Sequence, residues 1–204
     1  MDINFIFSII VLIFSVILHE LSHGMAAEAL GDPTPRMQGR LTLNPFSHLD
    51  LVGSFLLPVL TYNLGGFIFG WAKPVEFNPY NLKNQKWGEA IVAVTGPLTN
   101  FLIALVFGLA MRLLGPAVLG YTTFSLLSIV VVVNISLMIF NLIPIAPLDG
   151  SKILFSLTAY RFPRFRDFYE KYSITLLILF LIFGGVILST GVHFVYSIIT
   201  GLNI

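Results

Sequence analysis

Two histidines and a glutamate stand together near the start of the chain, in the run His19-Glu20-Leu21-Ser22-His23. A helix turns about 100° per residue, so positions 19 and 23 lie about 40° apart on one face. Two imidazoles placed in this way can bind one metal ion from adjacent turns, and Glu20 is close enough to take a proton from a water molecule at that metal. The spacing predicts a hydrolytic metal site, although the same pattern also occurs by chance in soluble helices.

A catalytic zinc ion usually has three protein ligands and one open position. The chain has no cysteine, so an aspartate or a glutamate must complete the site. Asp149 is the best candidate, because it follows an apolar segment in which Pro144 and Pro147 interrupt the helix and Gly150 allows a turn. We therefore predict one Zn²⁺ per chain, bound by His19, His23 and Asp149, with a helix cap as the alternative role for Asp149.

This chemistry is embedded in a very apolar sequence. Of 204 residues, 56% are hydrophobic and 10% are charged, whereas a soluble domain has roughly 25% charged residues. The composition predicts a protein of the lipid bilayer, and a net charge of +1 argues against nucleic acid as a partner. An ionised group at the centre of a membrane helix costs a few kcal/mol, so the HExxH run in this setting is expected to be functional.

Five apolar runs divide the chain, at residues 3–29, 51–72, 90–111, within 113–148 and at 172–204. The second run is broken by Pro58 and several glycines, which favours a re-entrant element over a span. Re-entry places every basic residue except Arg112 on one face, which the positive-inside rule assigns to the cytoplasm. The alternative, in which this run crosses the bilayer, divides the basic residues between both faces.

We expect an all-α membrane protein with about four transmembrane helices, one re-entrant element and a small membrane-associated β-sheet. Residues 1–204 form a single intramembrane domain, with a catalytic core at about 3–155 and a C-terminal transmembrane helix at about 172–200. His19 comes 16 residues after Ile3, or roughly 24 Å along a helix, which places it toward the cytoplasmic side and level with Asp149.

Two further sets of residues are candidates for substrate binding. The alternating run Leu41, Thr42, Leu43 and Asn44 predicts a strand, paired with residues 75–77, whose edge receives an extended substrate; an ordinary interfacial loop is the alternative. Asn100 and Asn141 carry amides at membrane depth and are candidate oxyanion donors. Hydrogen bonding between helices is the alternative role for both.

Three motifs occur in order along the chain: HELSHG at 19–24, GPLTN at 96–100 and NLIPIAPLDG at 141–150. Together they resemble the signature motifs of the site-2 protease family (peptidase family M50), in its small branch without a PDZ or CBS domain. These proteins are intramembrane zinc metalloproteases of regulated intramembrane proteolysis. The resemblance implies that His19, His23 and Asp149 bind zinc and that Glu20 is the catalytic base. It also implies a transmembrane or membrane-anchored protein substrate and a location in a prokaryotic cell membrane, with the active site toward the cytoplasm.

Two other functions remain open from the sequence. A metal-ion transporter could use the same ligands, but the outer halves of the spans carry few polar residues for a path. An inactive membrane scaffold is the second alternative, against which the intact Glu20 argues. The sequence does not predict the substrate, the trigger for cleavage or the oligomeric state.

Overall fold

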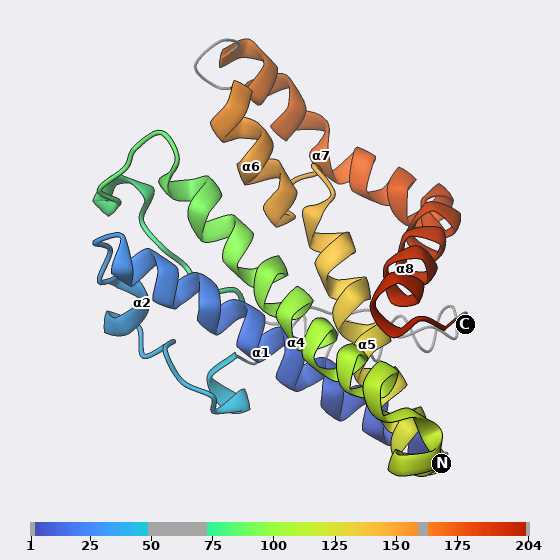
Figure 1. Cartoon of the computed structure of the whole chain (residues 1–204). Coiled ribbons are helices and arrows are strands. Elements are labelled where there is room, and N and C mark those ends of the chain that lie inside the picture. The colour runs from blue at the N-terminus through green and yellow to red at the C-terminus, as the bar shows by residue number, and fades with distance from the viewer. Residues whose placement is uncertain (1–2, 49–72, 159–162, 203–204) are drawn as a thin grey trace.

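The computed structural model describes residues 3–48, 73–158 and 163–202, and this part of the chain is helical (Figure 1). Its elements, in order, are α1 (Ile3–Ala29), α2 (Thr34–Met37), the 3-10 turns η1 (Pro45–His48) and η3 (Pro79–Asn81), α4 (Gly88–Leu119), α5 (Tyr121–Leu142), α6 (Asp149–Thr158), α7 (Pro163–Phe183) and α8 (Gly185–Thr200). Residues 51–72 lie outside the described residues, and so does the prediction that they form a re-entrant element.

Among the described residues, three helices are long and apolar enough to cross a bilayer: α1, α4 and α5. Their outward side chains are also apolar; Ile6, Ile10 and Phe14 of α1 are exposed, as lipid contact requires. A helix meets this requirement because all of its backbone hydrogen bonds are internal. The chain is therefore an integral, multi-pass membrane protein.

The C-terminal run differs from the single transmembrane helix predicted at about 172–200. Helices α7 and α8 pass the length and hydropathy test only as a pair, and they meet at a bend of 68°. Two adjacent glycines, Gly184 and Gly185, weaken the helix at this point, and the Phe180 ring lies so close to Gly184 that a side chain there would collide with it. A fourth span exists among the described helices only if the bent pair is counted as one.

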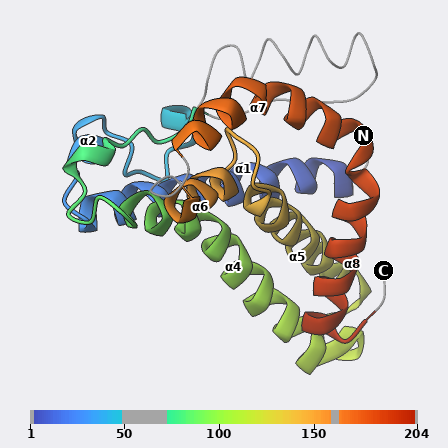
Figure 2. The same cartoon turned by 90° about the horizontal axis from the view of Figure 1, so that it is seen from above.

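Helices α1, α4 and α5 pack side by side, and α8 lies against α4 and α5 (Figures 1 and 2). The contact with α8 is the main apolar core, formed by Ala104, Met111, Val131, Ile135, Val192, Tyr196 and Ile199. The buried Tyr196 hydroxyl is hydrogen-bonded to Ser128 Oγ at 2.9 Å. A second small cluster of Ala27, Leu82 and Val92 joins the end of α1 to α4. These contacts hold α1 and α4 together at the level of the HExxH motif.

The predicted β-sheet is wrong for the described residues, because the structure has no strand there. Residues 41–44 form a bend, in which the Asn44 N–H donates to Thr42 Oγ1 and the Phe46 N–H donates to Asn44 Oδ1. Residues 73–78 are irregular, and the Val75 N–H donates to Glu20. Short polar side chains thus take up backbone groups that a sheet would have used. The side chains of Leu41 and Val75 both lie over Gly24.

A buried aspartate anchors the segment that follows residue 73. Asp32 is fully buried after α1, and its carboxylate accepts hydrogen bonds from the Thr34 N–H and hydroxyl, the Asn78 N–H and the Asn81 amide. Burial alone would raise the pKa of Asp32, but these hydrogen bonds outweigh it and hold the pKa below its ordinary value. Asp32 therefore fixes residues 78–81 against the end of α1, near the HExxH helix.

Candidate metal centre

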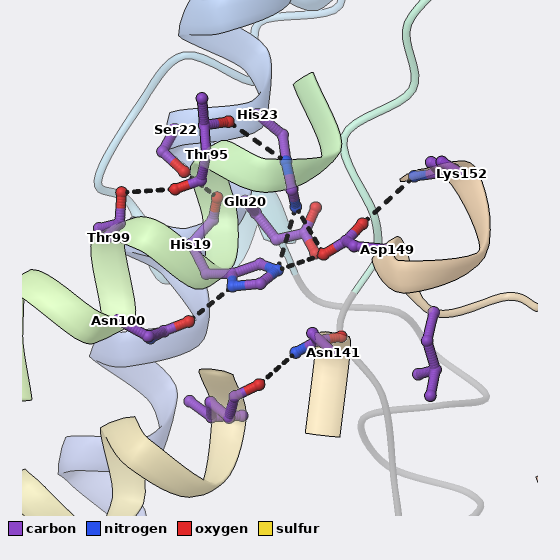
Figure 3. Close-up of polar contacts among 12 residues, drawn as sticks. His19, Glu20, Ser22, His23, Thr95, Thr99, Asn100, Asn141, Asp149 and Lys152 are labelled. Atoms are coloured by element: carbon purple, nitrogen blue, oxygen red, sulfur yellow. Dashed lines mark hydrogen bonds and ion pairs between the residues drawn. The ribbon is translucent and has the colours of Figure 1, made fainter. Parts of the chain in front are cut away.

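His19, His23 and Asp149 converge on one point between α1 and the start of α6 (Figure 3). Asp149 Oδ2 lies 3.1 Å from Nε2 of each histidine, and the two Nε2 atoms are 3.0 Å apart. All three side chains are buried. His19 and Asp149 are 130 positions apart in the sequence, and they meet because α4 and α5 carry the chain away from α1 and back.

The other ring nitrogen of each histidine has its own acceptor. His23 Nδ1 donates to the Val92 carbonyl at 2.7 Å, and His19 Nδ1 donates to Asn100 Oδ1 at 2.6 Å. Each imidazole therefore turns an Nε2 lone pair toward the carboxylate of Asp149. Three electron-rich atoms so close together repel one another, and a metal cation bound between them would relieve this repulsion.

A zinc ion fits this donor set. Two imidazole nitrogens and one carboxylate oxygen are ligands that zinc takes in hydrolytic sites, with bonds of about 2.0–2.2 Å. Tetrahedral ligands at that distance lie about 3.3 Å from one another, close to the separations observed here. The fourth tetrahedral position is left for water or substrate.

Gly96 of α4 forms the wall behind the two imidazoles. A Cβ at this position would lie 2.5 Å from Nε2 of both His19 and His23. The glycine of the GPLTN motif is therefore required for steric reasons, because only a residue without a side chain lets α4 approach the site this closely.

Glu20 lies beside the ligands, and one of its oxygens is held in place. Oε2 accepts the backbone N–H of Val75 at 2.8 Å, from the segment that Asp32 anchors. A cavity of about 110 Å³ opens in front of the site, lined by His19, Glu20, His23, Pro74, Val75, Phe77, Asn141, Pro147, Leu148, Asp149 and Lys152. It provides room for a water molecule and a peptide carbonyl next to Glu20.

Asp149 is held from both sides of its carboxylate. Oδ2 faces the imidazoles, and Oδ1 lies 3.4 Å from Lys152 Nζ, one turn further along α6. Lys152 Nζ also lies 5.5 Å from the centre of the Phe77 ring. Gly150 lets the chain pass close enough to α5 for this arrangement, because a Cβ there would collide with the carbonyl oxygens of Leu142 and Ile143.

The remaining predicted residues lie in different places. Asn141 borders the cavity and donates to the Leu137 carbonyl of its own helix. Asn100 is fully buried behind His19 and does not line the cavity, so the structure does not place it as an oxyanion donor. Leu41, Thr42, Leu43 and Asn44 do not line it either.

Three residues near the site were missed from the sequence, although each leaves a signal. Lys152 follows Asp149 by three residues and so shares its helix face. Gly96 opens the GPLTN motif, and a glycine within an apolar span is a signal of close helix packing. Asn134 follows four consecutive valines in a membrane span, where a polar side chain is costly and usually has a role.

Comparison with known proteins supports the same conclusion. The profile of peptidase family M50 matches residues 7–120 and 116–184. The chain is 37% identical over 154 residues to "Putative zinc metalloprotease YwhC" of Bacillus subtilis, a match covering 72% of this chain and 66% of that protein. It is 32% identical over 139 residues to Rip2 of Mycolicibacterium smegmatis, which has the same description; this match covers 68% of the chain and 52% of Rip2.

A third relative, zinc metalloprotease MJ0392 of Methanocaldococcus jannaschii, is 29% identical over 145 residues, covering 71% of this chain and 32% of that protein. The chain thus aligns with two thirds or less of the length of these relatives. No solved structure shows a significant match. The family profile spans most of the described helices and the three converging residues, and the chain therefore belongs to peptidase family M50, the site-2 protease family.

Proposed function

We propose that this chain is an intramembrane zinc endopeptidase that hydrolyses transmembrane or membrane-anchored polypeptides. The observation that carries the proposal is the convergence of His19, His23 and Asp149, with Glu20 beside them, on helices that belong in a bilayer. The zinc metalloproteases among the relatives support the choice of metal and reaction.

The residues divide the chemistry among them. His19, His23 and Asp149 hold the metal, which supplies a Lewis acid that polarises the scissile carbonyl and makes water acidic. Glu20 takes a proton from the attacking water and returns it to the leaving amine as the C–N bond breaks. The Val75 N–H holds Oε2 of Glu20 and thereby sets the direction of the carboxylate.

The surroundings of the site favour an extended substrate. A helical peptide hides its backbone, whereas the cavity is narrow and is bordered by the irregular segment that contains Pro74, Val75 and Phe77. A substrate must therefore unwind locally before its carbonyl can reach Glu20. The site lies in the second half of α1, and we propose that this half is at the cytoplasmic side, because Arg36, Lys73 and Lys152 follow at that end.

The buried polar residues around His19 do not support a transport path. Ser15, Asn100 and Asn134 bond to one another and to backbone carbonyls, so their polar groups are already satisfied. Metal transport would require groups that exchange partners with a moving ion. The protease is therefore the better function for this geometry.

The test is a cleavage assay in proteoliposomes with a model transmembrane peptide, comparing Glu20→Gln with the native protein. Gln keeps the shape and the Val75 hydrogen bond but cannot accept the proton. Cleavage should fall by about 10²- to 10⁴-fold, while the bound zinc is retained. Glu28→Gln is the matched control, because Glu28 lies on the same helix and pairs with Arg36 on the surface; it should cleave normally.

Cleavage that survives in Glu20→Gln contradicts the proposed role of Glu20. Zinc flux into the vesicles that is equal in the native protein and in Glu20→Gln, without cleavage by either, would establish transport instead.

A further inference from the structure

Behind His19, on the side away from the cavity, three buried polar side chains form a line between the helices. Asn100 of α4 and Asn134 of α5 are fully buried, and Ser15 of α1 is nearly so. Asn100 Nδ2 donates to Asn134 Oδ1 at 2.9 Å, and Asn134 Nδ2 donates to Ser15 Oγ at 2.9 Å. Nothing in the proposed chemistry uses Asn134 or Ser15.

The side-chain amide of Asn134 has only one orientation that satisfies its hydrogen bonds. Asn134 Nδ2 also donates to the Val130 carbonyl at 2.9 Å, and a carbonyl can only accept. Asn134 must therefore turn its nitrogen toward Val130 and its Oδ1 toward Asn100. The orientation of Asn100 follows in the same way, because its Nδ2 faces two acceptors: Asn134 Oδ1 and, at 3.4 Å, the Ser15 carbonyl.

The orientation of Asn100 in turn determines the tautomer of His19. With its nitrogen committed, Asn100 offers only Oδ1 to His19, so His19 Nδ1 must carry the proton. The lone pair is then on Nε2, which faces His23 and Asp149. If Asn100 were free to flip, its Nδ2 would face Nδ1 and would favour the tautomer with the proton on Nε2, which cannot bind a metal through Nε2.

We infer that Asn134 is a positioning residue for the metal: through Asn100, and assisted by Ser15, it fixes the tautomer and orientation of His19. The metal-binding half of the proposed function underlies this inference, whereas proteolysis does not. We call the hydrogen-bonded chain from Asn134 through Asn100 to His19 the relay. An unpaired amide in this buried setting would cost free energy, so the relay has one arrangement with all its hydrogen bonds made and a flipped arrangement of higher free energy.

His23 shows why such a relay is needed on one side only. Its Nδ1 reaches the Val92 carbonyl directly, and a backbone carbonyl cannot flip. His19 Nδ1 faces the Asn100 side chain instead of a backbone carbonyl, so side-chain amides connect His19 to the Val130 carbonyl of α5 and the Ser15 carbonyl of α1. Outer partners of metal-binding histidines commonly fix the tautomer in this way.

The alternative for Asn134 is a purely structural role as a hydrogen-bonding contact between helices. Zinc affinity separates the two roles, because a structural contact affects unfolding without changing affinity in the folded protein. The probe is Zn²⁺ alone, titrated against a chelator into purified protein in detergent, and no cleavage is measured.

Asn134→Leu removes the relay and should weaken zinc binding by about tenfold, at the lower end of the effect of outer partners. Asn134→Asp should restore the affinity to within about threefold, because a protonated carboxyl can donate to Val130 while accepting from Asn100. Val131→Ala is the control, since Val131 is fully buried on α5 in the apolar core; it should lower the melting temperature and leave the affinity unchanged.

Should Asn134→Leu fail to fold, Asn134→Val makes the same deletion with a smaller side chain. In the zinc-loaded native protein, ¹⁵N-histidine NMR should show an Nδ1 proton on His19 that exchanges slowly with water. Native affinity in the apolar variants, or a rapidly exchanging Nδ1 proton, would overturn the inference while leaving the proposed function intact. A native protein that binds no zinc would instead overturn the proposed function.

Discussion

The two sides of the metal centre are built in different ways. The metal wall, formed by Val92, Gly96, Asn100 and Asn134 behind the histidines, is buried and has its side-chain amides hydrogen-bonded within the helices. The substrate wall, formed by Val75, Phe77, Asn141 and Lys152, borders the cavity and is partly exposed, with the exception of the buried Val75. One wall fixes donor atoms in place, whereas the other leaves side chains free to meet a substrate.

This difference shows how a membrane protease can combine rigidity with access. Metal ligands must be held within a few tenths of an ångström, which packed helices in a bilayer achieve. On the proposed function a substrate must enter and unwind, and the irregular residues 73–78 border the cavity in which this would occur. Substitutions in the metal wall should therefore change zinc affinity, and those in the substrate wall should change cleavage at constant zinc.

The largest effect is expected for Gly96→Ala. The new methyl group would lie 2.5 Å from Nε2 of both histidines, so α4 or the imidazoles must move. Zinc affinity should fall by about 100-fold, measured by chelator competition. Gly108→Ala is a matched control on the same helix, because its methyl group would lie 2.5 Å from Ile199, far from the metal; a similar loss of affinity there would show that the effect is general.

A smaller and different effect is expected for Lys152→Met, which removes a charge from the substrate wall and keeps the length. The Lys152 side chain is partly exposed and lies 3.4 Å from the buried Asp149, so the pair should contribute less than about 1 kcal/mol and zinc affinity should change by less than about fivefold. Lys152 lines the cavity, and we expect its ammonium group to donate a hydrogen bond to the substrate. Such a bond from a charged donor is worth about 1.5–3 kcal/mol, so kcat/KM should fall by at least about tenfold. A fall in zinc affinity large enough to account for the whole fall in kcat/KM would place Lys152 in the metal wall instead.

The smallest effect on the site is expected for Asp32→Asn, which weakens the anchor of the substrate wall. The amide nitrogen would face N–H donors, and the unfolding free energy should fall by about 1–3 kcal/mol, with unchanged zinc affinity in the folded protein. The pKa of Asp32 is lowered on folding, so its contribution is complete above its ordinary value of 3.8 and is lost as the pH falls below that value. Thermal unfolding should show this acid loss in the native protein and less of it in Asp32→Asn.

Much of the helical framework could be predicted from the sequence, because apolar length alone defines α1, α4 and α5. The convergence of His19, His23 and Asp149 could be expected from helix geometry and from the prolines before Asp149. The β-sheet could not be judged correctly from the alternation of residues 41–44, because Thr42 and Asn44 bond locally to the backbone. The bend coincides with the adjacent glycines Gly184 and Gly185, but the presence of glycines does not by itself predict a bend of 68°. The bonds from Asn134 to Asn100 and Ser15 depend on which helices lie opposite, and that information is absent from local spacing.

The central claim is that two histidines of α1 and the aspartate of α6 hold one metal ion. Its most direct test is the zinc content of the purified protein, native and Asp149→Ala, after loading with zinc and removal of excess metal, with Glu89→Ala as a surface control. The account predicts about one zinc per chain in the native protein and the control, and almost none in Asp149→Ala. An Asp149→Ala protein that still holds one zinc per chain, or a folded native protein that holds none, would contradict it.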